Sequence, residues 1–131
     1  MSHKRSIEDY LEAILVIRKE SASCRCVDVA AYMEYSKPSV SIAMAKLESE
    51  GYIDRREDGQ LYLTPSGEKI ACEVLEKHSF LTSFFQSIGV SEKTAREDAC
   101  KLEHSLSAES YEKFKEWFEN NRKQSKSEEK I

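Results

Sequence analysis

The sequence predicts a mainly α-helical protein that carries one short β-hairpin. Two observations support this fold class. Apolar residues recur every three or four positions along most of the chain, which is the period of amphipathic helices. Only one pair of short segments alternates between apolar and polar residues, and Asp58-Gly59 lies between them. We therefore expect strands only between residues 52 and 63.

The length and composition indicate a small globular protein. The chain has 131 residues, of which 40% are apolar, so it can bury the core of one domain or of two small ones. It has no apolar run of about 18 residues and no apolar signal sequence, so we expect a cytoplasmic protein. Four cysteines at irregular spacings do not suggest a disulfide framework, and we expect free thiols or metal ligands at Cys24, Cys26, Cys72 and Cys100.

The first two helices follow from capping residues and apolar periodicity. Ser6 is the expected N-cap of a helix whose apolar face continues to about Arg18. Asp9 and Glu12 lie side by side on this helix, at the spacing i, i+3. A polar turn over residues 20–25 then separates it from a short helix over residues 27–33.

The third helix begins after Ser36, its expected N-cap, and ends at Gly51. Pro38 lies in the first turn, where a missing amide proton costs nothing. Val40, Ala43, Met44 and Leu47 form the expected inner face. The outer face carries short side chains that can approach base edges in a DNA major groove, so we predict DNA contacts at its start and along it: Ser36, Lys37, Pro38, Ser39, Ser41, Ile42 and Lys46.

The hairpin completes the order of a winged helix-turn-helix domain. We expect a type I′ turn at Asp58-Gly59, because both central residues of that turn need positive φ. In winged domains the second helix of the motif reads the groove and the hairpin, or wing, contacts phosphates. We therefore predict phosphate contacts from Arg55 and Arg56, with ion pairs to the adjacent Glu57 and Asp58 as the alternative.

The rest of the chain is predicted to be helical. Thr64 is the expected cap of a helix that has Pro65 in its first turn and His78 on its apolar side. Helix is expected to resume from Ser79 and to end at Gly89. Ser91 and Ser107 are expected to cap two more helices. The last contains an aromatic stripe that favours an intramolecular core over an interface: Tyr111, Phe114, Trp117 and Phe118. We predict a DNA-binding domain over residues 1–65, a helical domain over 66–120 and a frayed polar tail over 121–131.

Six residues are candidate metal ligands. Cys100, Glu103 and His104 have the spacing i, i+3, i+4, which places a thiol, a carboxylate and an imidazole on one helix face. Asp9, Glu12 and His78 add two carboxylates and an imidazole from other helices. Each feature alone is more typical of a solvated face or a buried histidine, but the combination favours metal binding. A metal held by all of them would link separate parts of the fold.

Several of these segments, in this order, resemble the diphtheria toxin repressor family of metal-dependent transcription regulators. The resemblance covers residues 5 to about 119 and includes Ser6-Ile7-Glu8-Asp9-Tyr10-Leu11-Glu12, the helix-turn-helix, Leu63-Thr64-Pro65-Ser66-Gly67, His78 and Cys100-x-x-Glu103-His104. It implies a cytoplasmic homodimer that is not an enzyme: winged domains bind operator DNA, and the helical C-terminal domain dimerises. We expect the architecture of the two-domain manganese transport regulators, because no segment of this sequence resembles the SH3-like third domain of the iron-responsive members.

The resemblance also implies the ligands and the metal. The ligand positions of the family fall on Asp9, Glu12, His78, Cys100, Glu103 and His104, and one or two ions of Mn(II) or Fe(II) per subunit are expected. Asp9 matches the manganese regulators, whereas Cys100 matches the iron regulators. A further site of the iron type is not expected, because its positions hold Thr82 and Arg96.

The charge of the chain indicates how a metal could control DNA binding. The net charge is −4, with −3 over residues 1–78, so attraction to phosphates should be weak without help. Carboxylates and a thiolate brought together would repel each other until a divalent cation joined them. Two other hypotheses remain: a metal-independent winged-helix regulator that senses oxidants through Cys24 and Cys26, and, more remotely, a binuclear metal hydrolase, for which we find no substrate pocket or general base.

Overall fold

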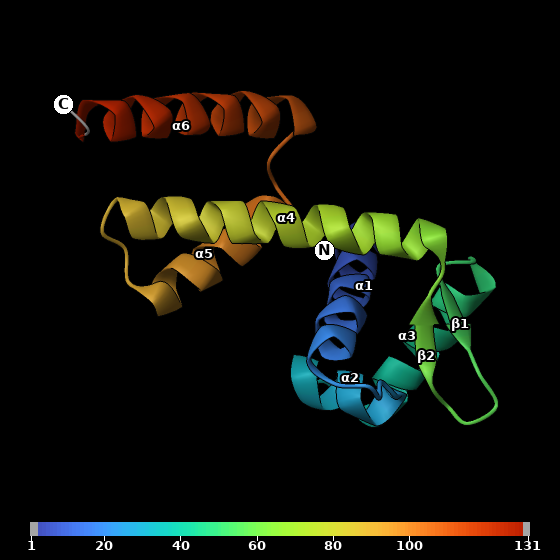
Figure 1. The fold of residues 1–131 in the computed structure, drawn as a ribbon. Helices are drawn as coiled ribbons and strands as arrows, with labels where there is room; N and C mark the ends of the chain where they lie inside the picture. Colours follow the sequence, from blue (N-terminus) through green and yellow to red (C-terminus); the bar gives the residue numbers. More distant parts are fainter. Residues whose placement is uncertain (1–2, 130–131) are drawn as a thin grey trace. The chain divides into compact units, whose positions relative to one another are not determined.

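The computed structural model describes residues 3–129, and side chains over residues 6–122. The chain divides into two compact units, residues 1–75 and 76–131. Along the described part the elements are α1 (His3–Glu20), α2 (Cys26–Met33), α3 (Lys37–Ser49), β1 (Ile53–Arg55), β2 (Leu61–Leu63), α4 (Pro65–Ser87), α5 (Glu92–Glu103) and α6 (Ala108–Glu129) (Figure 1). The predicted mainly helical fold with one hairpin is confirmed.

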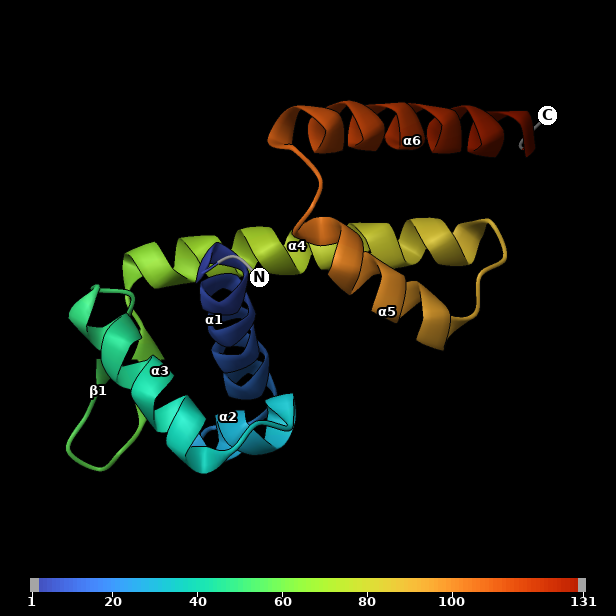
Figure 2. The ribbon, with the colours of Figure 1, turned by 180° about the vertical axis from the view of Figure 1, so that it is seen from behind.

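The first unit is a three-helix cluster closed by the hairpin (Figure 2). Its core contains Leu11 and Ile14 from α1, Val29 from α2, and Val40 and Met44 from α3. Each of these side chains is fully buried, so burial of apolar surface holds the three helices and the hairpin together. The predicted inner face of α3 is confirmed, with Val40, Met44 and Leu47 buried and Ala43 half-buried.

Two cap predictions in this unit had different outcomes. Ser36 caps α3 as predicted, because its Oγ accepts a hydrogen bond from the Ser39 amide and Pro38 lies in the first turn. Ser6 is not the N-cap of the first helix, since α1 already begins at His3. No glycine or proline precedes Ser6, so nothing in the chain stops the helix from starting a turn earlier.

The hairpin is short and antiparallel, with Ile53 opposite Leu63 and Arg55 opposite Leu61. The predicted type I′ turn is wrong. Only Gly59 has positive φ, at 85°, while Asp58 does not. The Gly59 amide donates to the Arg56 carbonyl, and the Arg56 amide donates to the Gln60 carbonyl. This is the three-residue loop in which a turn is followed by a left-handed glycine.

Thr64 anchors the start of α4 to the end of α3. Its Oγ1 donates to the Gly51 carbonyl at 2.7 Å and accepts from the Gly67 amide at 3.2 Å, which confirms the predicted cap. A β-carbon at Gly67 would collide with the Tyr52 carbonyl, so only glycine allows this approach. The Thr64-Pro65-Ser66-Gly67 segment therefore fixes the direction in which α4 leaves the wing.

The second unit contains the end of α4 with α5 and α6. The predicted restart of helix at Ser79 is wrong, because α4 is continuous to Ser87. Phe80 and Phe84 of α4 pack edge-to-face against Tyr111, Phe114 and Phe118 of α6, which confirms the intramolecular packing of these three rings. The prediction is wrong for Trp117, which is exposed. The Oγ of Ser107 accepts from the Ser110 amide and so caps α6.

Helix α6 continues through most of the segment predicted to be a frayed tail. It extends to Glu129, and residues 130–131 lie outside the described residues. Residues 121–129 contain neither glycine nor proline, so no residue there breaks the helix. Within the described residues, none of the helices combines the length and the apolar character needed to span a membrane.

Candidate functional site

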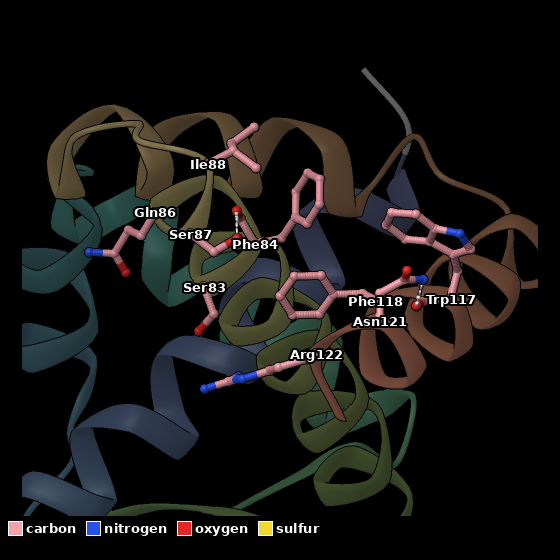
Figure 3. Close-up of a pocket in the computed structure, with 9 residues that line it drawn as sticks. All are labelled: Ser83, Phe84, Gln86, Ser87, Ile88, Trp117, Phe118, Asn121 and Arg122. Atoms are coloured by element: carbon pink, nitrogen blue, oxygen red, sulfur yellow. Dashed lines mark hydrogen bonds between the residues drawn. The ribbon is translucent and has the colours of Figure 1, made fainter. Parts of the chain in front are cut away.

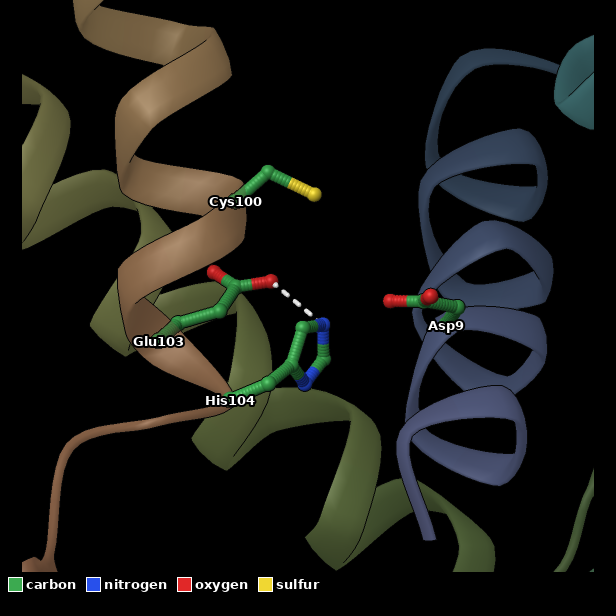
Figure 4. A group of neighbouring side chains, drawn as sticks. All are labelled: Asp9, Cys100, Glu103 and His104. Carbon is green, nitrogen blue, oxygen red and sulfur yellow. Dashed lines mark ion pairs between the residues drawn. The ribbon is translucent and has the colours of Figure 1, made fainter. Parts of the chain in front are cut away.

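The C-terminal end of α5 presents three ligand types together. Cys100 and Glu103 lie on the last turn of α5, and His104 is its C-cap residue. One ligand atom from each of the three lies within 4.8 Å of the others, and Figure 4 shows their side chains projecting from the same side of the helix. The predicted convergence of a thiol, a carboxylate and an imidazole is therefore present within the second unit.

Glu103 is the centre of this arrangement. It is 4% exposed and is the only buried charged residue among the described side chains. Its Oε1 lies 3.3 Å from His104 Nε2, and its Oε2 lies 3.2 Å from Nδ1 of His78, which is on α4. The carboxylate thus faces two imidazoles from two helices, one at each oxygen.

This carboxylate has the properties of a metal ligand. No donor in the described part of the chain makes a hydrogen bond of good geometry to either Glu103 oxygen. A buried carboxylate without such donors is costly unless a cation compensates it. Imidazole, thiol and carboxylate together suit a divalent transition metal, so the residues fit the predicted ion. Because each oxygen faces a different imidazole, the same carboxylate could serve one ion or two.

The two remaining predicted ligands are in the first unit. Asp9 and Glu12 are both half-buried on α1, three residues apart on one face, as predicted. Burial raises the pKa of the intervening Tyr10, and the negative charge of Asp9 contributes to this shift.

Thr82 and Arg96 occupy the two positions of the further iron-type site, so neither position offers a carboxylate. Thr82 and Arg96 line a small cavity of about 280 Å³ together with His78, Ser79 and Ser83. Thr82 Oγ1 donates to the His78 carbonyl at 2.8 Å, and Arg96 forms an ion pair with Glu92 one turn earlier. Thr82 and Arg96 are therefore both engaged by other residues of the second unit.

The outer face of α3 is exposed along its length. Ile42 is 73% exposed at its centre, and the other predicted DNA-contacting residues of this helix are exposed too: Ser36, Lys37, Pro38, Ser39, Ser41 and Lys46. Ser36 and Ser39 share a hydrogen bond at 2.8 Å between their hydroxyls. The helix therefore offers a surface of short side chains with one apolar residue in the middle.

The two wing arginines differ in their surroundings. Arg55 is half-buried, and its Nη2 donates to the Cys26 Sγ at 3.6 Å. Arg56 is exposed, and its guanidinium lies 3.9 Å from the centre of the Tyr62 ring. Of the two, Arg56 is the better placed for a phosphate.

Two further residues next to the wing were not predicted to have a role. The Arg18 guanidinium lies 4.0 Å from the same Tyr62 ring, and its Nη1 donates to the Leu61 carbonyl at 3.1 Å. The sequence placed Arg18 at the end of the apolar period of the first helix and Tyr62 in an alternating strand. Neither pattern indicates that residues 44 positions apart would stack.

The cysteines of the Cys24-Arg25-Cys26 segment are free thiols. Cys24 is fully buried, and burial raises its pKa to about 11, with the Asp28 charge adding to the shift. Such a thiol stays protonated at neutral pH and is a poor nucleophile. The hypothesis of an oxidant sensor that uses both cysteines is therefore not favoured.

Comparisons with known proteins identify both halves of the chain. Residues 3–61 match the iron dependent repressor N-terminal DNA binding domain, and residues 64–130 match the iron dependent repressor metal binding and dimerisation domain. The transcriptional regulator MntR of Salmonella typhimurium is 38% identical over 114 residues, which cover 86% of this chain and 73% of that protein.

Solved structures show the same fold. The manganese regulator SloR has a TM-score of 0.76 at 24% identity, over 86% of this chain and 53% of its own. IdeR of T. acidophilum has a TM-score of 0.71 at 29% identity, over 85% of this chain and 53% of its own. The chain thus spans about half the length of these two structural neighbours.

Proposed function

This chain belongs to the iron dependent repressor family, and we propose that it binds operator DNA as a homodimer when a divalent metal ion is bound at Glu103 and its neighbours. The observation that carries the proposal is the buried Glu103 carboxylate between two imidazoles. The family consists of transcriptional regulators, so the chain is a metal-dependent regulator and the hydrolase hypothesis is not favoured. As a DNA-binding regulator it would act in the cytoplasm.

The full ligand set in this proposal is Asp9, Glu12, His78, Cys100, Glu103 and His104. Glu103, Cys100 and the two imidazoles offer no oxygen ligand beyond the Glu103 carboxylate, and a hard divalent ion prefers oxygen, so the α1 carboxylates would supply it. A bound cation neutralises carboxylates and a thiolate that would otherwise repel each other. Asp9 and Glu12 would then hold the DNA-binding unit against the dimerising unit, so occupancy of the ligands would couple to operator affinity.

The ligand chemistry supports Mn(II) or Fe(II). Three carboxylates are hard oxygen ligands that suit Mn(II), whereas the Cys100 thiolate is soft and raises the affinity of competing metals. The family name refers to iron, and a structural neighbour is a manganese regulator. We propose that both ions activate, with Mn(II) the physiological signal because Asp9 adds an oxygen ligand. The two Glu103 oxygens face different imidazoles, so the carboxylate could bind one ion or bridge two per subunit.

The proposed DNA surface is the exposed face of α3 with the wing. Ile42 would contact a thymine methyl, while Lys37 and Lys46 flank it and contact phosphates. The serines at positions 36, 39 and 41 and Pro38 allow close approach to base edges. On the wing the exposed Arg56 would contact a phosphate directly. The half-buried Arg55 would attract phosphates through its charge.

We propose that the dimer forms through an apolar groove of the second unit. The groove has a volume of about 810 Å³, lies between the end of α4 and α6, and is lined by Phe84, Ile88, Trp117 and Phe118 among others (Figure 3). Ile88 and Trp117 are 63% and 60% exposed, which is unusual for side chains of this size. The groove falls within the segment that matches a dimerisation domain, so a second copy is the occupant that we propose.

The test is operator binding as a function of metal. A duplex selected from a random pool by the Mn(II)-loaded protein would be titrated under anaerobic conditions with Mn(II), Fe(II) or a chelator. We expect affinity to rise by about 5- to 150-fold on metal addition, the range of ordinary allosteric coupling. Equal affinity with metal and with chelator would refute the proposal. Loss of binding by the Mn(II)-loaded protein on mild oxidation would support the cysteine hypothesis only if Cys26→Ser prevented it, because oxidation of the proposed ligand Cys100 would have the same effect.

A further inference from the structure

The ring of Tyr62 in β2 has a guanidinium close to its centre from each of two arginines. Arg18, at the end of α1, and Arg56, at the start of the wing turn, lie 4.0 and 3.9 Å from the ring centre. Both distances lie within the range of a cation–π contact, so Tyr62 contacts two cations.

One hydrogen bond fixes the Arg18 end of this stack. Arg18 Nη1 donates to the carbonyl of Leu61, the residue before the ring, and Leu61 itself is fully buried. Arg18 and Tyr62 are half-buried, whereas Arg56 is exposed. The stack therefore has an anchored end at Arg18 and a free end at Arg56.

The acidic residues of the wing do not neutralise that free end. Asp58 Oδ1 accepts from the Gln60 amide at 3.0 Å, which holds this carboxylate inside the turn. Among the described residues, no carboxylate forms an ion pair with Arg56.

We infer that Arg18 and Tyr62 are positioning residues for a phosphate contact made by Arg56, a role that rests on the proposed function of the wing. A free arginine loses side-chain entropy when it binds a phosphate, and this loss weakens binding. A guanidinium already ordered on Tyr62 has lost most of that freedom before DNA arrives. Tyr62 and Arg18 would thus strengthen DNA binding without touching it.

A double-mutant cycle distinguishes this role from a merely structural one. Tyr62→Ile removes the ring face but keeps a side chain that favours a strand, Tyr62→Phe keeps the face, and Arg56→Gln removes the phosphate contact. Binding of the Mn(II)-loaded protein to its selected duplex would be measured by fluorescence anisotropy at several salt concentrations. Thermal unfolding would be followed for each variant.

We expect Tyr62→Ile to weaken binding by about 2- to 12-fold, which corresponds to the entropy of ordering one long side chain. Arg56→Gln should lower the slope of log affinity against log salt by about 1, the signature of one lost phosphate contact. In the Arg56→Gln background Tyr62→Ile should have no further effect. Tyr62→Phe should bind like wild type.

Three outcomes would overturn the inference. Tyr62→Ile could weaken binding equally in both backgrounds, it could leave wild-type affinity unchanged, or Arg56→Gln could leave the salt slope unchanged. If Tyr62→Ile unfolds, Arg18→Gln in the same two backgrounds tests the coupling through the other arginine of the stack, with Arg18→Lys as its conservative control. A wild-type protein that fails to bind DNA with metal would refute the proposed function instead, so the two failures are distinct.

Discussion

Replacing Glu103 by glutamine should have opposite effects on the metal-free and the metal-loaded protein. The substitution keeps the shape of the side chain and removes its charge. Glu103 is 4% exposed, and neither of its oxygens has a hydrogen-bond donor of good geometry among the described residues. An unsatisfied buried polar group costs about 1–3 kcal/mol and a charged one costs more. Glutamine keeps the first cost and loses the additional cost of the charge, so metal-free Glu103→Gln should be more stable than wild type.

With metal present the order should reverse. At a Mn(II) concentration of about 100 times the dissociation constant, wild type gains about 2.7 kcal/mol from binding. For a chain of this size that is a rise in melting temperature of roughly 10 °C. Glu103→Gln lacks the central ligand and should show no rise, nor any metal-dependent DNA binding.

Differential scanning fluorimetry with and without Mn(II) measures both effects in one experiment. Glu97→Gln is the matched control, because Glu97 lies on the same helix and is exposed. It should behave as wild type in both conditions. The reasoning is refuted if metal stabilises Glu103→Gln as much as wild type. It is also refuted if the metal-free variant is less stable than wild type, because the carboxylate would then be satisfied by its imidazoles alone.

Four other predictions follow from single residues. Ile42→Ala should reduce discrimination at one base pair by about 1–3 kcal/mol, measured across a panel of operator variants, and unchanged preference would exclude base reading by this face. Cys100→Ser should remove the thiolate-to-metal charge-transfer band of the Co(II) protein, and a band that persists would exclude Cys100 as a ligand. Trp117→Lys should convert the dimer to a monomer in sedimentation, since it places a charge in the apolar groove; a variant that stays dimeric would place the interface elsewhere. Because burial raises the pKa of Cys24 to about 11, its reaction with a thiol reagent at pH 8 should be far slower than that of exposed Cys72 and should accelerate as pH rises toward 11; equal rates at pH 8 would contradict its burial.

The sequence predicted those parts of the fold that depend on local chemistry. The predicted caps Ser36, Thr64 and Ser107 each accept a hydrogen bond from a backbone amide at a helix start. Ser91 lies at the predicted N-cap of α5, but its side chain makes no capping hydrogen bond. The buried face of α3 was likewise predicted from the helical spacing of its apolar residues. Family-level identification, from the order of the motifs, was also confirmed.

The turn type and the extent of the helices were harder to predict. Asp58-Gly59 is compatible with a two-residue turn and with a three-residue loop that ends in a left-handed glycine. The choice depends on the strand register, in which Arg55 pairs with Leu61, and that register is set by packing against the core. At Ser6 and beyond residue 120, the sequence contained polar residues that neither require nor forbid a helix.

In the candidate site, too, the sequence predicted what depends on local spacing and missed what depends on tertiary packing. The spacing of Cys100, Glu103 and His104 was enough to place their ligand atoms together, because one helix turn determines it. That Glu103 alone would be buried, with an imidazole at each oxygen, depends on how α4 packs on α5 and could not be derived from spacing. The contact of Arg18 with Tyr62 likewise joins α1 to the wing through tertiary packing.

The acidic character of the chain connects these features. With a pI of about 5.5, the protein cannot rely on general attraction to phosphates, so its affinity for DNA must come from a few well-placed groups. A divalent cation held by Glu103 and its partners adds positive charge and removes repulsion between the ligands. The Tyr62 stack orders one exposed arginine in advance. Because few phosphate contacts are then involved, the metal-loaded protein should show a shallow salt dependence, and metal should raise its affinity mainly by fixing geometry. A metal-induced increase in the salt slope of several units would instead indicate that added charge dominates.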